Sequence, residues 1–176
     1  RIAGSKEVKR EACIIMKDVI QEMLLESAEI IKKSVQLSNK IEEAIIVICD
    51  CVKNGNKVYL FGNGGSAADA QHIAAELIGR YKMERNSIPA ISLTTDTSVL
   101  TSLSNDYSFD NIFSRQCDGL VNRGDVVIAI STSGKSKNVI NGLTSAKKKG
   151  AKTIGLLGKK GGHMTNLVTI PTVSYT

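Results

Sequence analysis

Short apolar runs alternate with helical patterns from residue 57 onward, and this alternation constrains the fold more than any other feature of the sequence. The predicted strands, each rich in Val, Ile or Leu, are residues 57–61, 90–93, 125–130, 153–157 and 167–170. Helical patterns lie between them near residues 67–79, 97–103 and 137–149. The alternation predicts an α/β fold, a doubly wound parallel sheet in which ligands bind beyond the carboxyl ends of the strands.

The first 56 residues follow a different pattern, with apolar residues recurring at helical spacing over residues 14–25 and again over 41–48. We therefore predict two long N-terminal helices. The first is so apolar that it favours oligomerisation through helices, although packing on its own domain is the alternative. We expect one structural domain, in which residues 1–56 form helices that pack on the domain and at the oligomer interface. Residues 57–176 then form the α/β core.

The composition of the 176-residue chain predicts a soluble, cytoplasmic protein with no membrane partner. No apolar run approaches the roughly 20 residues needed to cross a bilayer, and the start at Arg1 lacks the features of a secretory signal. The four cysteines lack zinc-knuckle spacing, so we interpret them as free thiols. A net charge of +6 with seven aromatic residues and no Trp argues against nucleic acid and suits an anionic small molecule.

A hydroxyl-rich loop follows the predicted strand 125–130. It reads Ser131-Thr132-Ser133-Gly134-Lys135-Ser136 and leads directly into a predicted helix. The unpaired N–H groups and partial positive charge of a helix N-terminus favour a phosphate, and the hydroxyls add further donors. A plain N-cap needs only one hydroxyl, and no Walker A motif occurs in the chain. The loop therefore predicts a site for the phosphate of a phosphorylated sugar.

A glycine-rich loop, Gly62-Asn63-Gly64-Gly65-Ser66-Ala67, follows the first predicted strand and matches the dinucleotide pattern Gly-x-Gly-x-x-Ala. The acid that binds ribose in that pattern is expected about 20 residues on, whereas Asp96 lies more than thirty residues beyond Gly62. We therefore expect the loop to let sugar hydroxyls approach the backbone. Asn105-Asp106 offers an amide and a carboxylate at another predicted strand end, with a simple turn as the alternative.

Four polar residues, Asp69, His72, Glu76 and Arg80, follow the glycine-rich loop at steps of three, four and four. This spacing puts them on one helix face, which is either solvated surface or one wall of the ligand crevice. In the second case Glu76 is a candidate general base. His72 and Glu76 could also bind one divalent ion such as zinc, although two ligands do not complete a tetrahedral site.

These motifs, in this order, resemble the sedoheptulose-7-phosphate isomerases, or phosphoheptose isomerases, of the sugar-isomerase (SIS) domain group. The resemblance implies a flavodoxin-like five-stranded parallel sheet flanked by helices and a homotetramer with active sites between subunits. It also implies conversion of sedoheptulose 7-phosphate to glycero-manno-heptose 7-phosphate, which supplies lipopolysaccharide or capsule. The alternative is a noncatalytic SIS-domain regulator that binds a sugar phosphate or a replication-initiation protein.

The resemblance also implies roles for individual residues. Glu76 is the acid/base, and His72 with Glu76 binds one zinc ion per subunit. The residues implied to contact substrate are Asn63, Gly64, Gly65, Glu76, Asn105, Asp106, Ser131, Thr132, Ser133 and Ser136. The remaining zinc ligands and a second acid/base are expected on a helix beyond Thr176.

Overall fold

The computed structural model describes the backbone of residues 3–173 and the side chains of residues 16–159 and 161–172. The chain forms two compact units, Arg1–Gln36 and Leu37–Thr176. In the first unit, helix α1 (Ala3–Lys33) has exposed apolar side chains at Met16, Ile20 and Leu24. Because these three residues are spaced four apart, their side chains lie on one face of the helix.

The second unit is built on a five-stranded sheet in which all strand pairs are parallel and the order is β2-β1-β3-β4-β5. The strands are β1 (Val58–Gly62), β2 (Ala90–Ser92), β3 (Val126–Ser131), β4 (Lys152–Leu157) and β5 (Ile170–Val173). The helices are α2 (Ser38–Lys53), α3 (Gly65–Ile78), α4 (Thr97–Asp106), α5 (Ile112–Leu120) and α6 (Lys137–Lys148). Three 3₁₀ turns, η1 (Ser34–Leu37), η2 (Phe109–Asn111) and η3 (Lys159–Asn166), complete the described elements.

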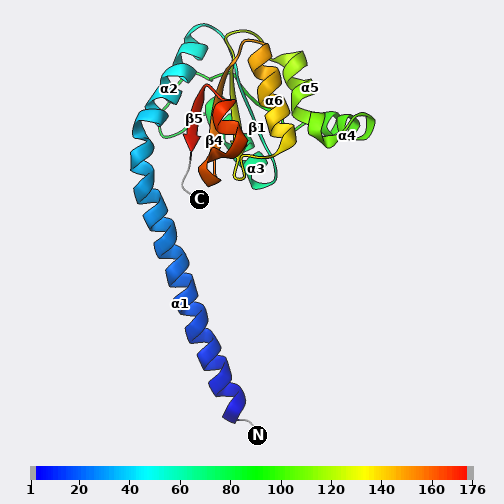
Figure 1. Cartoon of the computed structure of the whole chain (residues 1–176). Coiled ribbons are helices and arrows are strands. Elements are labelled where there is room, and N and C mark those ends of the chain that lie inside the picture. The colour runs from blue at the N-terminus through cyan, green and yellow to red at the C-terminus, as the bar shows by residue number, and fades with distance from the viewer. Residues whose placement is uncertain (1–2, 174–176) are drawn as a thin grey trace. The chain divides into compact units, whose positions relative to one another are not determined.

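Helices cover both faces of the sheet (Figure 1). Alternate residues of β1 point to opposite faces, so Tyr59 and Phe61 join one core cluster while Val58 and Leu60 join the other. The first cluster includes residues of α5 and α6, and the second includes residues of α2 and α3. The rings of Phe61 and Phe113 stack with centroids 4.7 Å apart. The sequence prediction of a doubly wound α/β sheet is therefore confirmed.

The strand order also fixes where a ligand can bind. The chain leaves β1 toward β2 on one side and later returns to β3 on the other side of β1, so the winding reverses between β1 and β3. A flavodoxin-like sheet binds its ligand at such a switch point, beyond the carboxyl ends of the strands. The glycine-rich and hydroxyl-rich loops lie there.

Several predicted boundaries were wrong. Strand β5 begins at Ile170 rather than at 167, because η3 and a turn occupy the preceding residues. Helix α5 was not predicted from the sequence. Helix α4 continues to Asp106, so Asn105 and Asp106 lie in its last turn and not in a strand-end loop. The hydroxyl of Ser104 donates to the carbonyl of Leu100 at 2.7 Å within this extension.

The division of the chain also differs from the expected boundary at residue 56. The compact units divide after Gln36, which groups α2 with the sheet. The physical reason is that Ala44 and Cys51 of α2 are buried in the same core cluster as Val58 and Leu60 of β1. Among residues 3–173, no helix is long and apolar enough to span a membrane.

The cysteines whose side chains are described, Cys49, Cys51 and Cys117, are free thiols. Burial, assisted by the nearby charge of Asp118, raises the pKa of Cys117 to about 12. This thiol stays protonated and serves as an apolar core residue.

The packing of α6 against the sheet is tested at Gly142. A Cβ at this position would lie 2.8 Å from Cζ of Phe61 and 2.9 Å from Cβ of Phe113. We expect Gly142→Ala to lower the free energy of unfolding by about 1–3 kcal/mol, measured by urea denaturation, because the core is overpacked.

The matched control is Gly119→Ala in α5, where a Cβ meets no atom within 4 Å. This substitution should stabilise the protein by up to about 1 kcal/mol through helix propensity. Equal stabilisation by both substitutions would contradict the packing described for Gly142.

Candidate functional site

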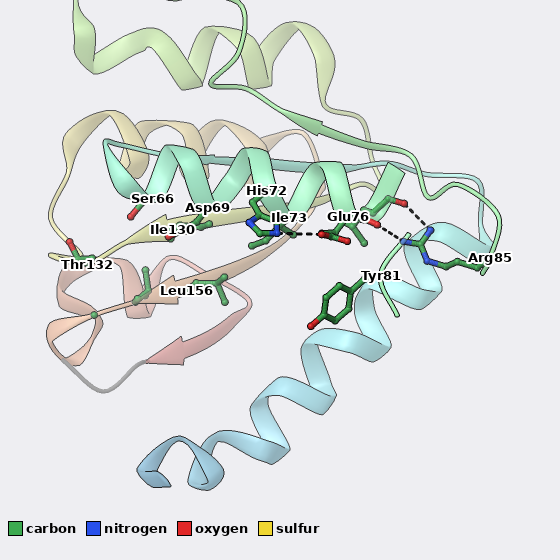
Figure 2. A pocket seen from close by; sticks show the side chains of 13 residues that line it. Ser66, Asp69, His72, Ile73, Glu76, Tyr81, Arg85, Ile130, Thr132 and Leu156 are labelled. Carbon is green, nitrogen blue, oxygen red and sulfur yellow. Dashed lines mark hydrogen bonds and ion pairs between the residues drawn. The ribbon is translucent and has the colours of Figure 1, made fainter. Parts of the chain in front are cut away.

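A cavity of about 730 Å³ lies beside α3 at the carboxyl ends of β3 and β4. One wall is the polar face of α3 together with the segment that follows it, and the other wall is formed by the ends of the two strands (Figure 2). The lining residues are Ser66, Asp69, His72, Ile73, Glu76, Leu77, Tyr81, Arg85, Ile130, Thr132, Leu156, Leu157 and Gly158. Asp69, His72 and Glu76 of the polar stripe therefore form a wall of the crevice rather than a solvated face alone.

His72 and Glu76 lie one helical turn apart on this wall. Nε2 of His72 is 3.3 Å from Oε1 of Glu76, and their side chains are 74% and 37% exposed. A carboxylate that is partly buried yet open to a cavity can exchange a proton with a bound molecule. The same two atoms can coordinate one divalent ion from a single helix face.

Helix α3 holds these groups because its opposite face packs on the sheet. Ala70 and Ala74 are buried in the core cluster that contains Leu60 of β1. Their small side chains let the helix lie close to the strand. Asp69, His72 and Glu76 consequently face away from this contact, toward the cavity.

Arg85 lines the cavity and was missed by the sequence analysis. Its guanidinium donates to the backbone carbonyls of Glu76 at 2.6 Å, Leu77 at 2.9 Å and Asn86 at 2.9 Å, as Figure 2 shows in part. The last carbonyls of a helix lack partners within the helix, and a cation there also opposes the negative end of the helix dipole. Arg85 therefore fixes the turn that carries Glu76.

Arg80, the cation that the sequence analysis selected, is turned elsewhere. Its Nε is 3.3 Å from Oε2 of Glu84, and both side chains are largely exposed. Arg80 does not line the cavity. The helical spacing that suggested Arg80 ceases to apply where α3 ends at Ile78, and the position of Arg85 depends on the path of the chain after the helix.

The hydroxyl-rich loop is held by hydrogen bonds from its backbone N–H groups to its own hydroxyl oxygens. The N–H of Gly134 donates to Oγ of Ser131, and the N–H of Lys135 donates to Oγ of Ser133, each at 3.2 Å. Gly134 has φ +62°, and a Cβ there would collide with the carbonyl oxygen of Gly161. The backbone of the loop at Gly134 therefore lies in close contact with the backbone of η3 at Gly161.

Two of the four hydroxyl groups in this loop do not act as a cap for α6. Ser136 is the N-cap residue of α6, yet its side chain makes no capping hydrogen bond. Thr132 is exposed and lines the cavity. The first N–H groups of α6 and these hydroxyls can therefore serve an anion.

The glycine-rich loop begins α3. Gly64 precedes the helix with φ +56° and ψ −124°, a conformation that favours glycine, and a Cβ on Gly64 or Gly65 would meet no atom within 4 Å. The backbone of this loop is accordingly open to a ligand. The side chain of Asn63 faces Asn138 of α6.

The remaining predicted residues are not brought to this cavity. Asn105 and Asp106 are exposed at the end of α4, where Nδ2 of Asn105 donates to Oδ1 of Asp106 at 2.9 Å. The other histidine, His163, is exposed in η3 and does not line the cavity. Of the predicted site residues, the cavity is lined directly by His72, Glu76 and Thr132.

Comparison with known proteins decides the family. The SIS domain family model matches residues 24–158. The phosphoheptose isomerase of Geotalea daltonii is 56% identical over 136 residues, which cover 77% of this chain and 71% of that protein. The phosphoheptose isomerase of Sulfurimonas denitrificans is 52% identical over 161 residues, 90% of this chain and 83% of that protein. The chain belongs to the phosphoheptose isomerase family.

Solved structures of phosphoheptose isomerases have the same fold. The enzyme from Neisseria gonorrhoeae matches with a TM-score of 0.84 and 36% identity, over 90% of this chain and 85% of that chain. The enzyme from Francisella tularensis matches with a TM-score of 0.87 and 32% identity, over 92% and 86%. The resemblance inferred from the sequence motifs is confirmed, and the SIS match spans both the polar wall of α3 and the hydroxyl-rich loop.

The free energy of unfolding tests whether Arg85 holds the end of α3. We expect Arg85→Ala to lower the free energy of unfolding by about 2 kcal/mol, because it removes charged hydrogen bonds to carbonyls at the end of α3. The matched control is Arg80→Ala, which breaks an exposed ion pair and should change stability by less than about 0.5 kcal/mol. Equal losses in urea denaturation would show that Arg85 does not hold the turn.

Proposed function

We propose that this protein converts sedoheptulose 7-phosphate to D-glycero-D-manno-heptose 7-phosphate, an isomerisation that begins bacterial heptose biosynthesis. The observation that carries the proposal is the carboxylate of Glu76 on the wall of the cavity, in a chain 52–56% identical to phosphoheptose isomerases. The acid/base lies on α3, while the predicted phosphate loop begins α6. One phosphorylated sugar can therefore contact both.

The reaction moves a carbonyl group from C2 to C1 through an enediol. Glu76 removes the proton from C1 as the C2 oxygen is protonated, and it then returns a proton to C2 as the C1 hydroxyl gives up its own. A single carboxylate can serve both carbon atoms because they are adjacent. A second acid/base must carry the proton between the two oxygens, and we propose that a segment other than α3 supplies it.

Recognition of the sugar phosphate is assigned to the two strand-end loops. The phosphate accepts hydrogen bonds from Ser131, Thr132, Ser133, Ser136 and the first N–H groups of α6. Gly64 and Gly65 let the sugar approach the backbone, which is supported by the open space above both residues. Asn105 and Asp106 do not line the cavity of their own chain, so we assign them to the site of a neighbouring subunit.

A homotetramer with sites between subunits would explain the exposure of these two residues. The exposed apolar face of α1, including Met16, Ile20 and Leu24, supports association through helices. Light scattering on the full chain measures this state directly.

Zinc is the proposed cofactor, with His72 and Glu76 as two of its ligands. Their donor types fit zinc, and the 3.3 Å separation of Nε2 and Oε1 lets both reach one ion. When bound, zinc polarises the oxygen atoms at C1 and C2. The described side chains contain no group of three or more His, Cys, Asp or Glu suited to a metal. We propose that another segment supplies the remaining ligands.

We assign the enzyme to the cytoplasm and its product to lipopolysaccharide or capsule. The alternative is a noncatalytic SIS-domain regulator that binds a sugar phosphate or a replication-initiation protein. The retained carboxylate of Glu76 and the adjacent His72 favour the enzyme, because a regulator needs neither proton transfer nor a metal. Turnover of sedoheptulose 7-phosphate separates the two.

Replacing the proposed acid/base tests the mechanism. We expect Glu76→Gln to lower kcat by about 10³-fold, since general acid–base groups typically contribute 10²- to 10⁴-fold. The measurement follows sedoheptulose 7-phosphate by NMR with saturating zinc. Glu42→Gln, which changes an exposed carboxylate on α2, should keep wild-type turnover. Unchanged turnover in Glu76→Gln would remove Glu76 from the reaction.

The metal assignment has its own test. We expect His72→Ala to lower bound zinc well below one ion per subunit, measured by elemental analysis after dialysis of the full chain, because one ligand is lost. His163→Ala removes the exposed histidine of η3 and should leave the zinc content unchanged. Equal zinc in wild type and His72→Ala would overturn the ligand assignment.

A further inference from the structure

A pair of asparagine side chains joins the two loops at the switch point. Nδ2 of Asn63 donates to Oδ1 of Asn138 at 2.9 Å, and Nδ2 of Asn138 donates to Oδ1 of Asn63 at 2.8 Å. Asn63 lies in the loop after β1, and Asn138 lies in the first turn of α6. Only side chains with both a donor and an acceptor can exchange two hydrogen bonds in this way.

Asn138 is the fixed partner of the pair. Its side chain is buried, with 2% of the residue exposed. The oxygen that accepts from Asn63 also accepts from the backbone N–H of Val139 at 2.9 Å. One atom therefore ties the start of α6 to the loop that begins α3.

Without this pair, each loop keeps its own local support. The hydroxyl-rich loop is held by the contact of Gly134 with Gly161, and α3 is held by Ala70 and Ala74 on the sheet. Gly62 of β1 and Ile130 of β3 are level in the sheet, so the loops leave side by side. The asparagine pair connects the loop after β1 to the first turn of α6. This connection lies beyond the end of the sheet, where hydrogen bonds between strands no longer fix the spacing of the chain.

The separation of the loops matters for a substrate held at both ends. In the proposed reaction Glu76 acts at C1 and C2, whereas the loop before α6 binds the phosphate on C7. We propose that Asn138 is a positioning residue that acts through Asn63, by holding the side chain of Asn63 in place between the two loops. This inference rests on the proposed isomerase function.

A double-mutant cycle separates this role from direct binding by Asn63. We expect Asn63→Ala and Asn138→Ala each to lower kcat for sedoheptulose 7-phosphate by about 10- to 100-fold, since small displacements of reacting groups have effects of this size. KM should change less than about threefold, and the double variant should be no slower than the slower single variant. Multiplied losses, or a wild-type kcat in Asn138→Ala, would overturn the proposal.

Unphosphorylated sedoheptulose provides the readout that general damage to the fold would not produce. This sugar engages only the Glu76 end, so the separation of the loops should matter little. We expect Asn138→Ala to lower its turnover by less than about threefold, against tenfold or more for the phosphorylated sugar. Equal losses with both sugars would mean that Asn138 only maintains the fold.

Two further measurements keep the test decisive. If Asn138→Ala does not fold, Asn138→Asp retains an acceptor for Val139 and for Asn63, and we expect a smaller loss of kcat that again disappears in an Asn63→Ala background. If the wild-type full chain does not isomerise the sugar, the proposed function fails. The double-mutant cycle then compares free energies of unfolding from urea denaturation. If the losses of the two single variants add up in the double variant, Asn63 and Asn138 do not interact, and the proposal fails.

Discussion

The parallel pairing of β1 and β3 is the constraint on which the rest of the structure depends. With Gly62 level with Ile130, two strands buried on both faces end at the same edge. The helices that follow them join different core clusters, α3 with α2 and α6 with α5. The loops between strand and helix therefore open toward one another while the helices are held apart by the sheet. This arrangement brings helix N-termini, hydroxyls and a carboxylate to one crevice without burying a charge in the core.

Sequence patterns predicted the central elements well because the signals there are local. Strands β1 and β3 were predicted within one residue, since continuous apolar runs end in Gly or Ser, and the polar stripe of α3 follows from helical periodicity alone. Helix α5 is only nine residues long and has Gly119 near its end, so the helical spacing of Ile112, Phe113 and Cys117 is too short a pattern to have been recognised in the sequence. The start of β5 was misjudged because Leu167 and Val168 look like a strand but end the η3 turn.

The candidate site was predictable wherever its residues lie on one element. His72, Glu76 and Thr132 were predicted and line the cavity. Arg85 and Asn138 were not selected, because their partners are fixed by tertiary folding: Arg85 returns to the end of α3, and Asn138 meets Asn63 across 75 positions. Asn105 and Asp106 show the reverse case, in which a plausible pair of residues stays outside the cavity of the chain that carries them.

The contact between Gly134 and Gly161 has a consequence for how this sequence can diverge. A Cβ on Gly134 would collide with the carbonyl oxygen of Gly161, and a Cβ on Gly162 would lie 2.8 Å from the carbonyl oxygen of Gly134. Gly134 and Gly162 are therefore both constrained, although only Gly134 belongs to the hydroxyl-rich loop. His163, by contrast, is exposed in the same turn and is open to replacement. The proposed phosphate loop therefore depends on two separate stretches of the sequence, because a methyl group added at Gly162 would displace the backbone of the hydroxyl-rich loop.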